Sequence, residues 1–255
     1  MRQQKTLAGR SVRALFAALA LGWAGGASAD ELRIAVTSNF RAAMGSLEAA
    51  WEAHSGHRLQ LSFGSTGKHY AQIRNGAPFD VFLAADSLRP ELLERDGLAA
   101  PGSRFTYAVG RLVLWSPQPD LVDADGAVLH TDKFRRLAIA NPEHAPYGAA
   151  AREVLEALGQ WQRLSARIVR GENVAQAFHF VSSGNAELGF FALAQTVGRD
   201  EAASGSSWRV PQALYTPIRQ QAVLLSDSAP ARSFLAWLRG DRATAIICDY
   251  GYDLP

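Results

Sequence analysis

The chain has 255 residues, of which 48% are hydrophobic and 20% are charged, with 26 lysines and arginines against 24 aspartates and glutamates. This balance excludes the strongly basic surface of a nucleic-acid-binding protein, so no nucleic-acid partner is expected. A single cysteine, Cys248, excludes an intramolecular disulfide, so the apolar core must hold the fold.

The N-terminus predicts an exported protein. Residues 1–13 contain four basic residues and no acidic one, the apolar run after them is too short to span a bilayer, and Ala-Ser-Ala at 27–29 is typical of a cleavage site. These features predict a cleaved signal peptide over residues 1–29 and a periplasmic location. Its removal leaves 226 residues with 22 basic against 24 acidic side chains, a length sufficient for two lobes of about 100 residues each.

Strand and helix patterns alternate along the rest of the chain. Short apolar runs predict strands at 32–36, 59–63, 81–85, 137–140, 166–170 and 188–193. Helical spacing of apolar residues predicts helices at 41–54, 68–75, 89–97, 147–159, 174–184, 231–240 and 242–252. This alternation predicts an α/β fold in which mostly parallel sheets are flanked by helices. The last helix contains Cys248, whose thiol we expect to be packed.

Two longer β-type runs, 105–116 and 218–226, are suited to cross between two lobes. We therefore expect lobe 1 at residues 30–110 plus 222–255 and lobe 2 at residues 111–221, with a hinged cleft between them. The Gly-, Pro- and Ser-containing stretches at 116–128 and 199–215 are expected to be surface loops.

The residues most indicative of function lie in four turns, each of which follows a predicted strand and precedes a predicted helix. They lie at 36–43, 63–70, 141–150 and 171–177, and the polar groups that they offer are Thr37, Ser38, Asn39, Ser65, Thr66, Tyr147 and Asn173. Any one of these residues could be an ordinary helix cap. Their coincidence predicts an anion site, because helix N-termini carry unpaired N–H groups and partial positive charge.

A competing interpretation makes Ser65 a nucleophile. Ser65-Thr66-Gly67-Lys68 matches the S-x-x-K pattern of serine acyl-enzymes, with Lys68 as the base. Those enzymes also need a Lys-Thr-Gly strand, and beyond residue 29 the only other lysine is Lys133, followed by Phe134. A periplasmic serine hydrolase therefore remains the lesser alternative. His54 and His57 have no third ligand at a suitable spacing, so no metal cation site is predicted.

The chain resembles the periplasmic molybdate-binding proteins of ABC transporters. The motifs that carry the resemblance, in order, are TSNF (37–40), GSTG (64–67), NGAPFDVFLAAD (75–86), GSRFTYAVGRLVLWS (102–116), NPEHAPYG (141–148) and AELGFFALAQ (186–195). The resemblance implies a two-lobed periplasmic-binding-protein fold (type II-like), without catalytic activity or cofactor. It further implies a monomer that binds molybdate or tungstate and delivers it to a membrane permease.

The resemblance also implies which residues bind the ligand. The matching positions are Ser38, Asn39, Ser65 and Thr66, together with the backbone N–H groups of Tyr147 and Val174. Some members add a tyrosine hydroxyl where this chain has Ala192, a role that Asn39 could take over. A site made only of donors favours a fully deprotonated dianion, so sulfate stays open as an alternative ligand, whereas the proton of phosphate would need an acceptor.

Overall fold

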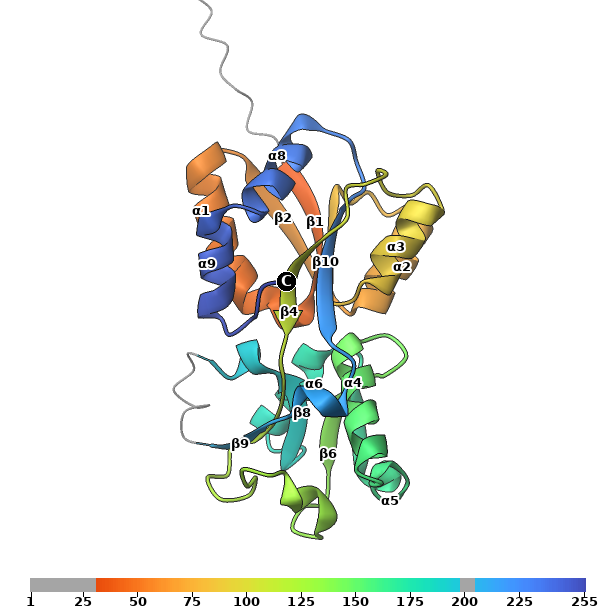
Figure 1. The fold of residues 1–255 in the computed structure, drawn as a ribbon, viewed down its shortest axis with the longest axis vertical. Helices are drawn as coiled ribbons and strands as arrows, with labels where there is room; N and C mark the ends of the chain where they lie inside the picture. Colours follow the sequence, from red (N-terminus) through yellow and green to blue (C-terminus); the bar gives the residue numbers. More distant parts are fainter. Residues whose placement is uncertain (1–30, 198–204) are drawn as a thin grey trace, which may run out of the picture.

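The structure is a computed structural model that describes residues 31–197 and 205–255. The predicted signal peptide at residues 1–29 lies outside the described residues. Within them, no helix is long and apolar enough to cross a membrane. Figure 1 shows two lobes stacked along the longest axis, with the chain passing between them through β4 and β10.

The first lobe is built on a five-stranded sheet in the order β2-β1-β3-β10-β4. Its strands are β1 (Glu31–Thr37), β2 (Arg58–Gly64), β3 (Val81–Ala84), β4 (Phe105–Gly110) and β10 (Ile218–Leu224). Four strands run in one direction and β10 runs against both of its neighbours. Because β10 pairs with β4 from Ile218 onward, residues 218–221, which the sequence assigns to the second lobe, pair within the first sheet.

The second lobe repeats this arrangement in the order β7-β6-β8-β5-β9. Its strands are β5 (Leu112–Ser116), β6 (Leu137–Ala140), β7 (Ile168–Gly171), β8 (Leu188–Ala192) and β9 (Ser206–Arg209). Here β5 is the reversed strand. In each lobe the reversed strand is the one that the chain enters directly from the other lobe. The predicted class of mostly parallel sheets in two lobes is confirmed, but β9 lies where a loop was expected.

Helices cover both faces of the first sheet. Figure 1 places α1 (Arg41–Ser55), α8 (Ala229–Leu238) and α9 (Asp241–Asp249) on one side, and α2 (Thr66–Arg74) and α3 (Leu88–Arg95) on the other. Successive residues of β1 point to opposite faces. Ile34 and Val36 accordingly join the core on the α1 side, while Ala35 joins the core that contains Ile73 of α2. A strand buried on both faces explains the uninterrupted apolar run in the sequence.

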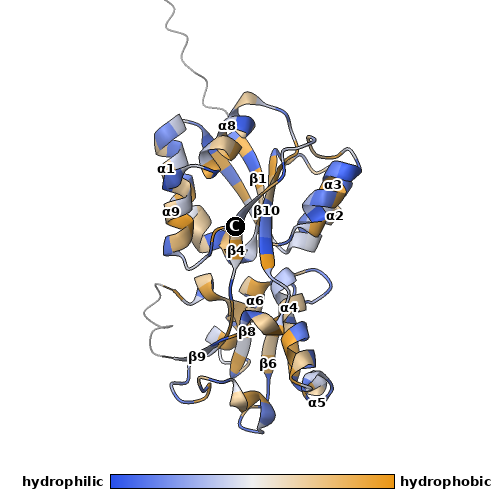
Figure 2. Ribbon diagram, in the orientation of Figure 1, coloured by the Kyte–Doolittle hydropathy of each residue, from blue (hydrophilic) through white to orange (hydrophobic). Residues whose placement is uncertain are grey.

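The second sheet is packed against α4 (Pro146–Ala157) and α6 (Val174–Ser182), with the short α5 (Trp161–Leu164) beside α4. Short 3-10 turns lie at Ser38–Phe40, Ala127–His130, Ser165–Arg167, Leu193–Gln195 and Gln212–Leu214. Figure 2 shows hydrophobic and hydrophilic residues interleaved along the helices, as expected for helices with one buried side.

The expectation of a packed Cys248 is wrong. In α9 the buried positions are Ala243 and Ile247, one helical turn apart. Cys248 follows Ile247 by one residue, which rotates its side chain by about 100° around the helix and out of the core. Its thiol is exposed.

Candidate anion-binding site

The four predicted turns come together between the lobes. In the first sheet β1 and β2 are parallel neighbours that end side by side at Thr37 and Gly64. In the second sheet β6 and β7 are parallel neighbours that end at Ala140 and Gly171. Each strand then turns into a helix, so the helix N-termini gather at the carboxyl ends of the strands, where ligands of α/β folds bind.

A small cavity lies at this meeting point. Its walls come from all four turns and from the end of β3: Thr37, Ser38, Asn39, Gly64, Ser65, Thr66, Ala85, Ala145, Pro146, Tyr147, Asn173 and Val174. The cavity admits the centre of a water-sized sphere in only about 10 Å³. That space suits a small inorganic ion held by hydrogen bonds and is far too small for an organic ligand.

The structure places all six predicted site residues in this wall, and none of them is more than 6% exposed. Ser65 caps α2, because its Oγ accepts the backbone N–H of Lys68 at 3.3 Å. The Oγ1 of Thr66 accepts the backbone N–H of Ala85 at 3.1 Å. In both contacts the hydroxyl acts as an acceptor and keeps its own proton. Each hydroxyl therefore still has one O–H group to donate to an anion.

Asn39 behaves differently from the expectation. Its Nδ2 donates to Oε1 of Gln220 at 2.8 Å and to the hydroxyl of Tyr252 at 3.2 Å, which accounts for both amide hydrogens. The Tyr252 hydroxyl in turn donates to the Asn39 carbonyl at 2.9 Å. The side chain of Asn39 is thus committed to the protein. What Asn39 can offer an ion is its backbone N–H, near the start of the Ser38–Phe40 turn.

Thr37 is a wall residue that was noted in the sequence but not selected. It is 2% exposed, and its Oγ1 has no hydrogen-bond partner among the described residues. Burial raises the pKa of Tyr107, and the Thr37 hydroxyl beside it lowers that pKa in part. The two hydroxyls are near each other but do not meet the geometry of a hydrogen bond. A buried hydroxyl without a partner costs about 1–3 kcal/mol. A bound anion could accept its proton.

The electrostatics of the cavity come from backbone groups. Among the described residues that line it there is no Lys, Arg, Asp or Glu. Positive potential is supplied by helix N-termini, each equivalent to about half a unit charge. Burial raises the pKa of Tyr107, Tyr147 and Tyr252 above the ordinary value for tyrosine. These phenols consequently stay neutral and place no negative charge beside the site.

Several contacts between described residues join the lobes across the cleft. The backbone N–H of Gly67 donates to the carbonyl of His144 at 2.8 Å. A guanidinium nitrogen of Arg89 donates to the carbonyl of Glu143 at 3.1 Å. Lys68 Nζ lies 3.1 Å from Oε1 of Glu172, in an ion pair in which both side chains are 51% exposed. The described structure is therefore the closed arrangement of the lobes.

The same contacts bear on the serine-hydrolase alternative. The Lys68 ammonium is paired with Glu172, and the bond to Ser65 Oγ comes from the backbone of Lys68. A nucleophilic serine needs a side-chain base that accepts its proton. Ser65 Oγ is the acceptor of a helix cap, and no side-chain base among the described residues is hydrogen-bonded to it.

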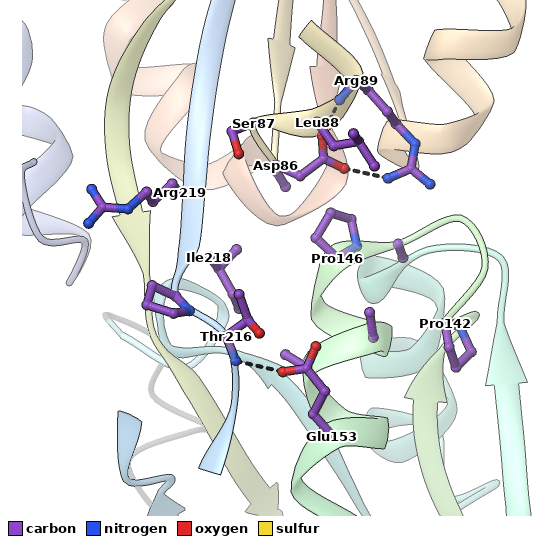
Figure 3. Close-up of a pocket in the computed structure, with 15 residues that line it drawn as sticks. Asp86, Ser87, Leu88, Arg89, Pro142, Pro146, Glu153, Thr216, Ile218 and Arg219 are labelled. Atoms are coloured by element: carbon purple, nitrogen blue, oxygen red, sulfur yellow. Dashed lines mark hydrogen bonds and ion pairs between the residues drawn. The ribbon is translucent and has the colours of Figure 1, made fainter. Parts of the chain in front are cut away.

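A larger cavity of about 320 Å³ lies beside the first, also between the lobes. Figure 3 shows Asp86 paired with Arg89 at its first-lobe edge, and Glu153 bonded to the backbone of Thr216 at its second-lobe edge. Both carboxylates would repel an anion, and the Arg89 guanidinium is already engaged by Asp86. The smaller cavity is the better candidate for an anion, because among the described residues that line it none is charged and helix N-termini open onto it.

Comparison with known proteins agrees with this geometry. A family model described as "Bacterial extracellular solute-binding protein" matches residues 32–253. The "Molybdate-binding protein ModA" of Azotobacter vinelandii is 50% identical over 231 residues, covering 89% of this chain and 92% of that protein. The protein of the same name from Rhodobacter capsulatus is 47% identical, covering 92% and 93%. The chain belongs to the ModA family of bacterial extracellular solute-binding proteins.

A solved structure of the same family extends the comparison to three dimensions. The periplasmic molybdate-binding protein of Azotobacter vinelandii superimposes with a TM-score of 0.85 at 45% identity, covering 88% of this chain and 99% of that one. The sulfate-binding protein SubI of Mycobacterium tuberculosis shares the fold alone, with a TM-score of 0.69 at 12% identity over 88% of this chain and 86% of that one. The ModA relatives are binding proteins, so the family is not one of enzymes.

Proposed function

We propose that this protein binds molybdate, and also tungstate, in the small cavity between its lobes and delivers the ion to the permease of an ABC transporter. The observation that carries the proposal is the convergence of four strand-to-helix turns on a cavity lined by donors, without a cation or a carboxylate among its described residues. The names of the ModA relatives from Azotobacter vinelandii and Rhodobacter capsulatus support molybdate as the ion.

Two kinds of donor would hold the ion. Ser38, Ser65 and Thr66 would donate through their hydroxyls, and Asn39, Tyr147 and Val174 through their backbone N–H groups. A hydrogen bond to a charged acceptor contributes about 1.5–3 kcal/mol, so six would supply roughly 9–18 kcal/mol before the costs of desolvation and of closing the lobes. Binding below about 1 µM requires about 8 kcal/mol, which lies within the range that remains when those costs are subtracted.

The chemistry of the donors selects the charge state of the ion. A donor-only wall can satisfy every oxygen of a dianion, but it has no acceptor for the remaining proton of hydrogen phosphate. We propose on this basis that phosphate is rejected. Size, rather than charge, would separate molybdate and tungstate from the smaller sulfate ion.

We propose that the protein acts in the periplasm as a monomer, after removal of residues 1–29. The match to a family of bacterial extracellular solute-binding proteins supports an exported location. The two strand crossings at Gly110–Leu112 and near Ile218 would form the hinge about which the lobes open and close.

The test is thermal unfolding of residues 30–255 titrated separately with molybdate, tungstate, sulfate, phosphate and chloride. A ligand that binds only the folded state stabilises it by RT ln(1 + [L]/Kd), about 4 kcal/mol at a thousandfold excess over Kd. We expect a large rise in Tm with molybdate and tungstate and little with the others. A rise in Tm with sulfate alone would support the cavity as an anion site but contradict molybdate as its ion. No rise in Tm with any ion would contradict the proposal.

A further inference from the structure

The side chain of Gln220 is buried at the junction between the lobes. It lies in β10, the strand that returns from the second lobe, and it is 0% exposed. Its Oε1 accepts from Nδ2 of Asn39 at 2.8 Å and from the hydroxyl of Tyr107 at 3.2 Å. Its Nε2 donates to the hydroxyl of Tyr147 at 3.4 Å. A buried amide is tolerated only when its polar atoms are bonded in this way.

These bonds connect opposite walls of the ion cavity. Asn39 belongs to the turn after β1 in the first lobe, and Tyr147 opens α4 in the second lobe. Gln220 stands between them on the crossing strand. The path Asn39–Gln220–Tyr147 therefore runs from one ion-binding turn, through the hinge, to the opposite one. The bond to Tyr147 joins the two lobes, whereas those to Asn39 and Tyr107 lie within the first lobe.

Gly110 provides the space for the link between the lobes. It is the last residue of β4, the other crossing strand. A Cβ at this position would lie 2.1 Å from the Tyr147 hydroxyl oxygen and 3.1 Å from Nε2 of Gln220. Real Cβ atoms do not approach that closely, so a larger residue at position 110 would push Tyr147 away from Gln220. The approach of Tyr147 to the hinge thus depends on a glycine there.

We propose that Gln220 is a positioning residue that couples the ion-binding turn of the first lobe to closure of the second. Through Oε1 it fixes Asn39, whose backbone N–H faces the ion, and through Nε2 it binds Tyr147 only when the lobes are closed. Opening the cleft would move Tyr147 away and leave a buried amide without its acceptor, which favours the closed state. The inference rests on the proposed function, because the ion is what closes the cleft.

The first test is Tyr147→Phe, measured by stopped-flow binding of molybdate to residues 30–255. This change keeps the backbone N–H at position 147 and removes only the acceptor for Gln220. We expect the dissociation rate to rise about three- to tenfold, the size of one neutral hydrogen bond, with the association rate unchanged within about twofold. Gln220→Met, which removes all three hydrogen bonds at similar volume, should raise the dissociation rate further.

A neighbouring glutamine supplies the control. Gln221 lies on the same strand, and its side chain accepts from Arg104 at 3.0 Å and donates to Thr106 at 3.2 Å, both in the first lobe. Gln221→Met should lower the Tm of the ion-free protein, as Gln220→Met does, but leave the molybdate dissociation rate within about twofold of the wild type. A purely structural role for Gln220 would make the two variants alike in both measurements.

A rescue experiment tests whether Gly110 provides the space that Tyr147 needs beside Gln220. Gly110→Ala should raise the Kd for molybdate more than about tenfold. The variant should also fail to close, so its radius of gyration, measured by X-ray solution scattering, should stay near that of the ion-free protein when molybdate is added. Adding Tyr147→Phe removes the clashing hydroxyl and should restore part of the affinity and of the compaction. If the double variant is no better than Gly110→Ala, the clash lies elsewhere and the inference is wrong.

Different results would contradict the proposed ion binding and the proposed coupling through Gln220. If wild-type protein binds neither molybdate nor tungstate, the proposed function falls, and the coupling falls with it. If the wild type binds and compacts while Tyr147→Phe and Gln220→Met release the ion at the wild-type rate, only the coupling is overturned.

Discussion

The two walls of the ion cavity are chemically unlike. The first lobe contributes the side-chain hydroxyls of Ser38, Ser65 and Thr66, each on a residue that is at most 6% exposed. The second lobe contributes Tyr147 and Val174, whose side chains turn away: the Tyr147 hydroxyl accepts from Gln220, and Val174 is part of the second core. Apart from the side-chain amide of Asn173, whose Oδ1 caps α6 by accepting the Gln176 N–H at 3.1 Å, the second wall offers an ion its backbone N–H groups.

The two walls should therefore differ in how strongly binding depends on the identity of each side chain. A hydroxyl donor depends on the identity of its residue, so changes in the first lobe should remove binding groups outright. A backbone donor is present in every residue but proline, so the second wall should tolerate changes of side chain and respond instead to anything that alters its distance from the first. Single substitutions in the two walls can test this division.

Ser65→Ala should weaken molybdate binding by about 10- to 100-fold, because it removes a donor to a charged acceptor worth about 1.5–3 kcal/mol. The affinity is measured by isothermal titration calorimetry. Ser228→Ala is a matched control, because Ser228 caps α8 by accepting the Ala231 N–H at 3.3 Å, the geometry of the Ser65 cap. Figure 1 shows α8 at the end of the first lobe that is far from the second lobe. Both variants should lose about 1 kcal/mol of stability from the lost cap.

Equal losses of affinity in Ser65→Ala and Ser228→Ala would mean that capping, and not donation to the ion, explains the effect. The hydroxyl wall of the first lobe would then have no special role, and the contrast between the lobes would disappear.

Gly67→Ala tests how closely the second-lobe wall must approach the first-lobe wall. The Gly67 N–H reaches the His144 carbonyl at 2.8 Å, and an added Cβ would lie 3.0 Å from His144 Cα and 3.1 Å from its carbonyl oxygen. The second-lobe turn would have to retreat by a few tenths of an ångström, so we expect Kd to rise about three- to tenfold. Stopped-flow kinetics should assign the change to faster dissociation.

Gly45→Ala is the control for a helical glycine. Gly45 lies within α1, and no atom lies within 4 Å of its added Cβ. The free energy of unfolding should rise by about 0.5–1 kcal/mol, with no change in Kd. If Gly67→Ala binds molybdate as tightly as Gly45→Ala, closure tolerates a wider gap than the structure implies.

Thr37→Val addresses the hydroxyl without a partner. If the Thr37 O–H donates to the ion, its loss should raise Kd about two- to fivefold, while Thr37→Ser should retain the wild-type Kd. The ion-free protein should be as stable as the wild type or more so, because the valine removes a buried polar group that has no bond. Calorimetry and denaturant unfolding measure the two quantities. A more stable variant with unchanged Kd would limit the hydroxyl donors to Ser38, Ser65 and Thr66.

The positions of the strand-to-helix turns could be predicted because their signals are local. Ser65 and Asn173 are caps that immediately precede helices, and caps of this kind can be recognised within a few residues. The six site residues were named from the resemblance to the molybdate-binding family, and their binding of an ion stays a prediction.

The parts that could not be predicted depend on contacts between distant segments. Gln220 and Tyr252 meet Asn39, and Tyr107 meets Gln220, only in the folded structure, and no local pattern marks Gln220 as fully buried. Strand β9 was missed because its buried residues, Ser206 and Trp208, are set in a Gly- and Ser-rich stretch that is typical of loops. Its pairing with β5 overrides that local preference.

Lys68→Ala should have the smallest effect, although Lys68 lies in the signature that first suggested an enzyme. Its ion pair with Glu172 crosses the cleft, but both side chains are half exposed, and such pairs contribute about 0–1 kcal/mol. We expect Kd for molybdate to change less than about threefold at 0.15 M salt, and the difference to shrink further at 0.5 M as the pair is screened. Lys133→Ala, which removes an exposed lysine of the second lobe, is the control for net charge. A tenfold loss in Lys68→Ala alone would show that a cation takes part in binding, and the account of a site built from neutral donors and helix N-termini would have to be replaced.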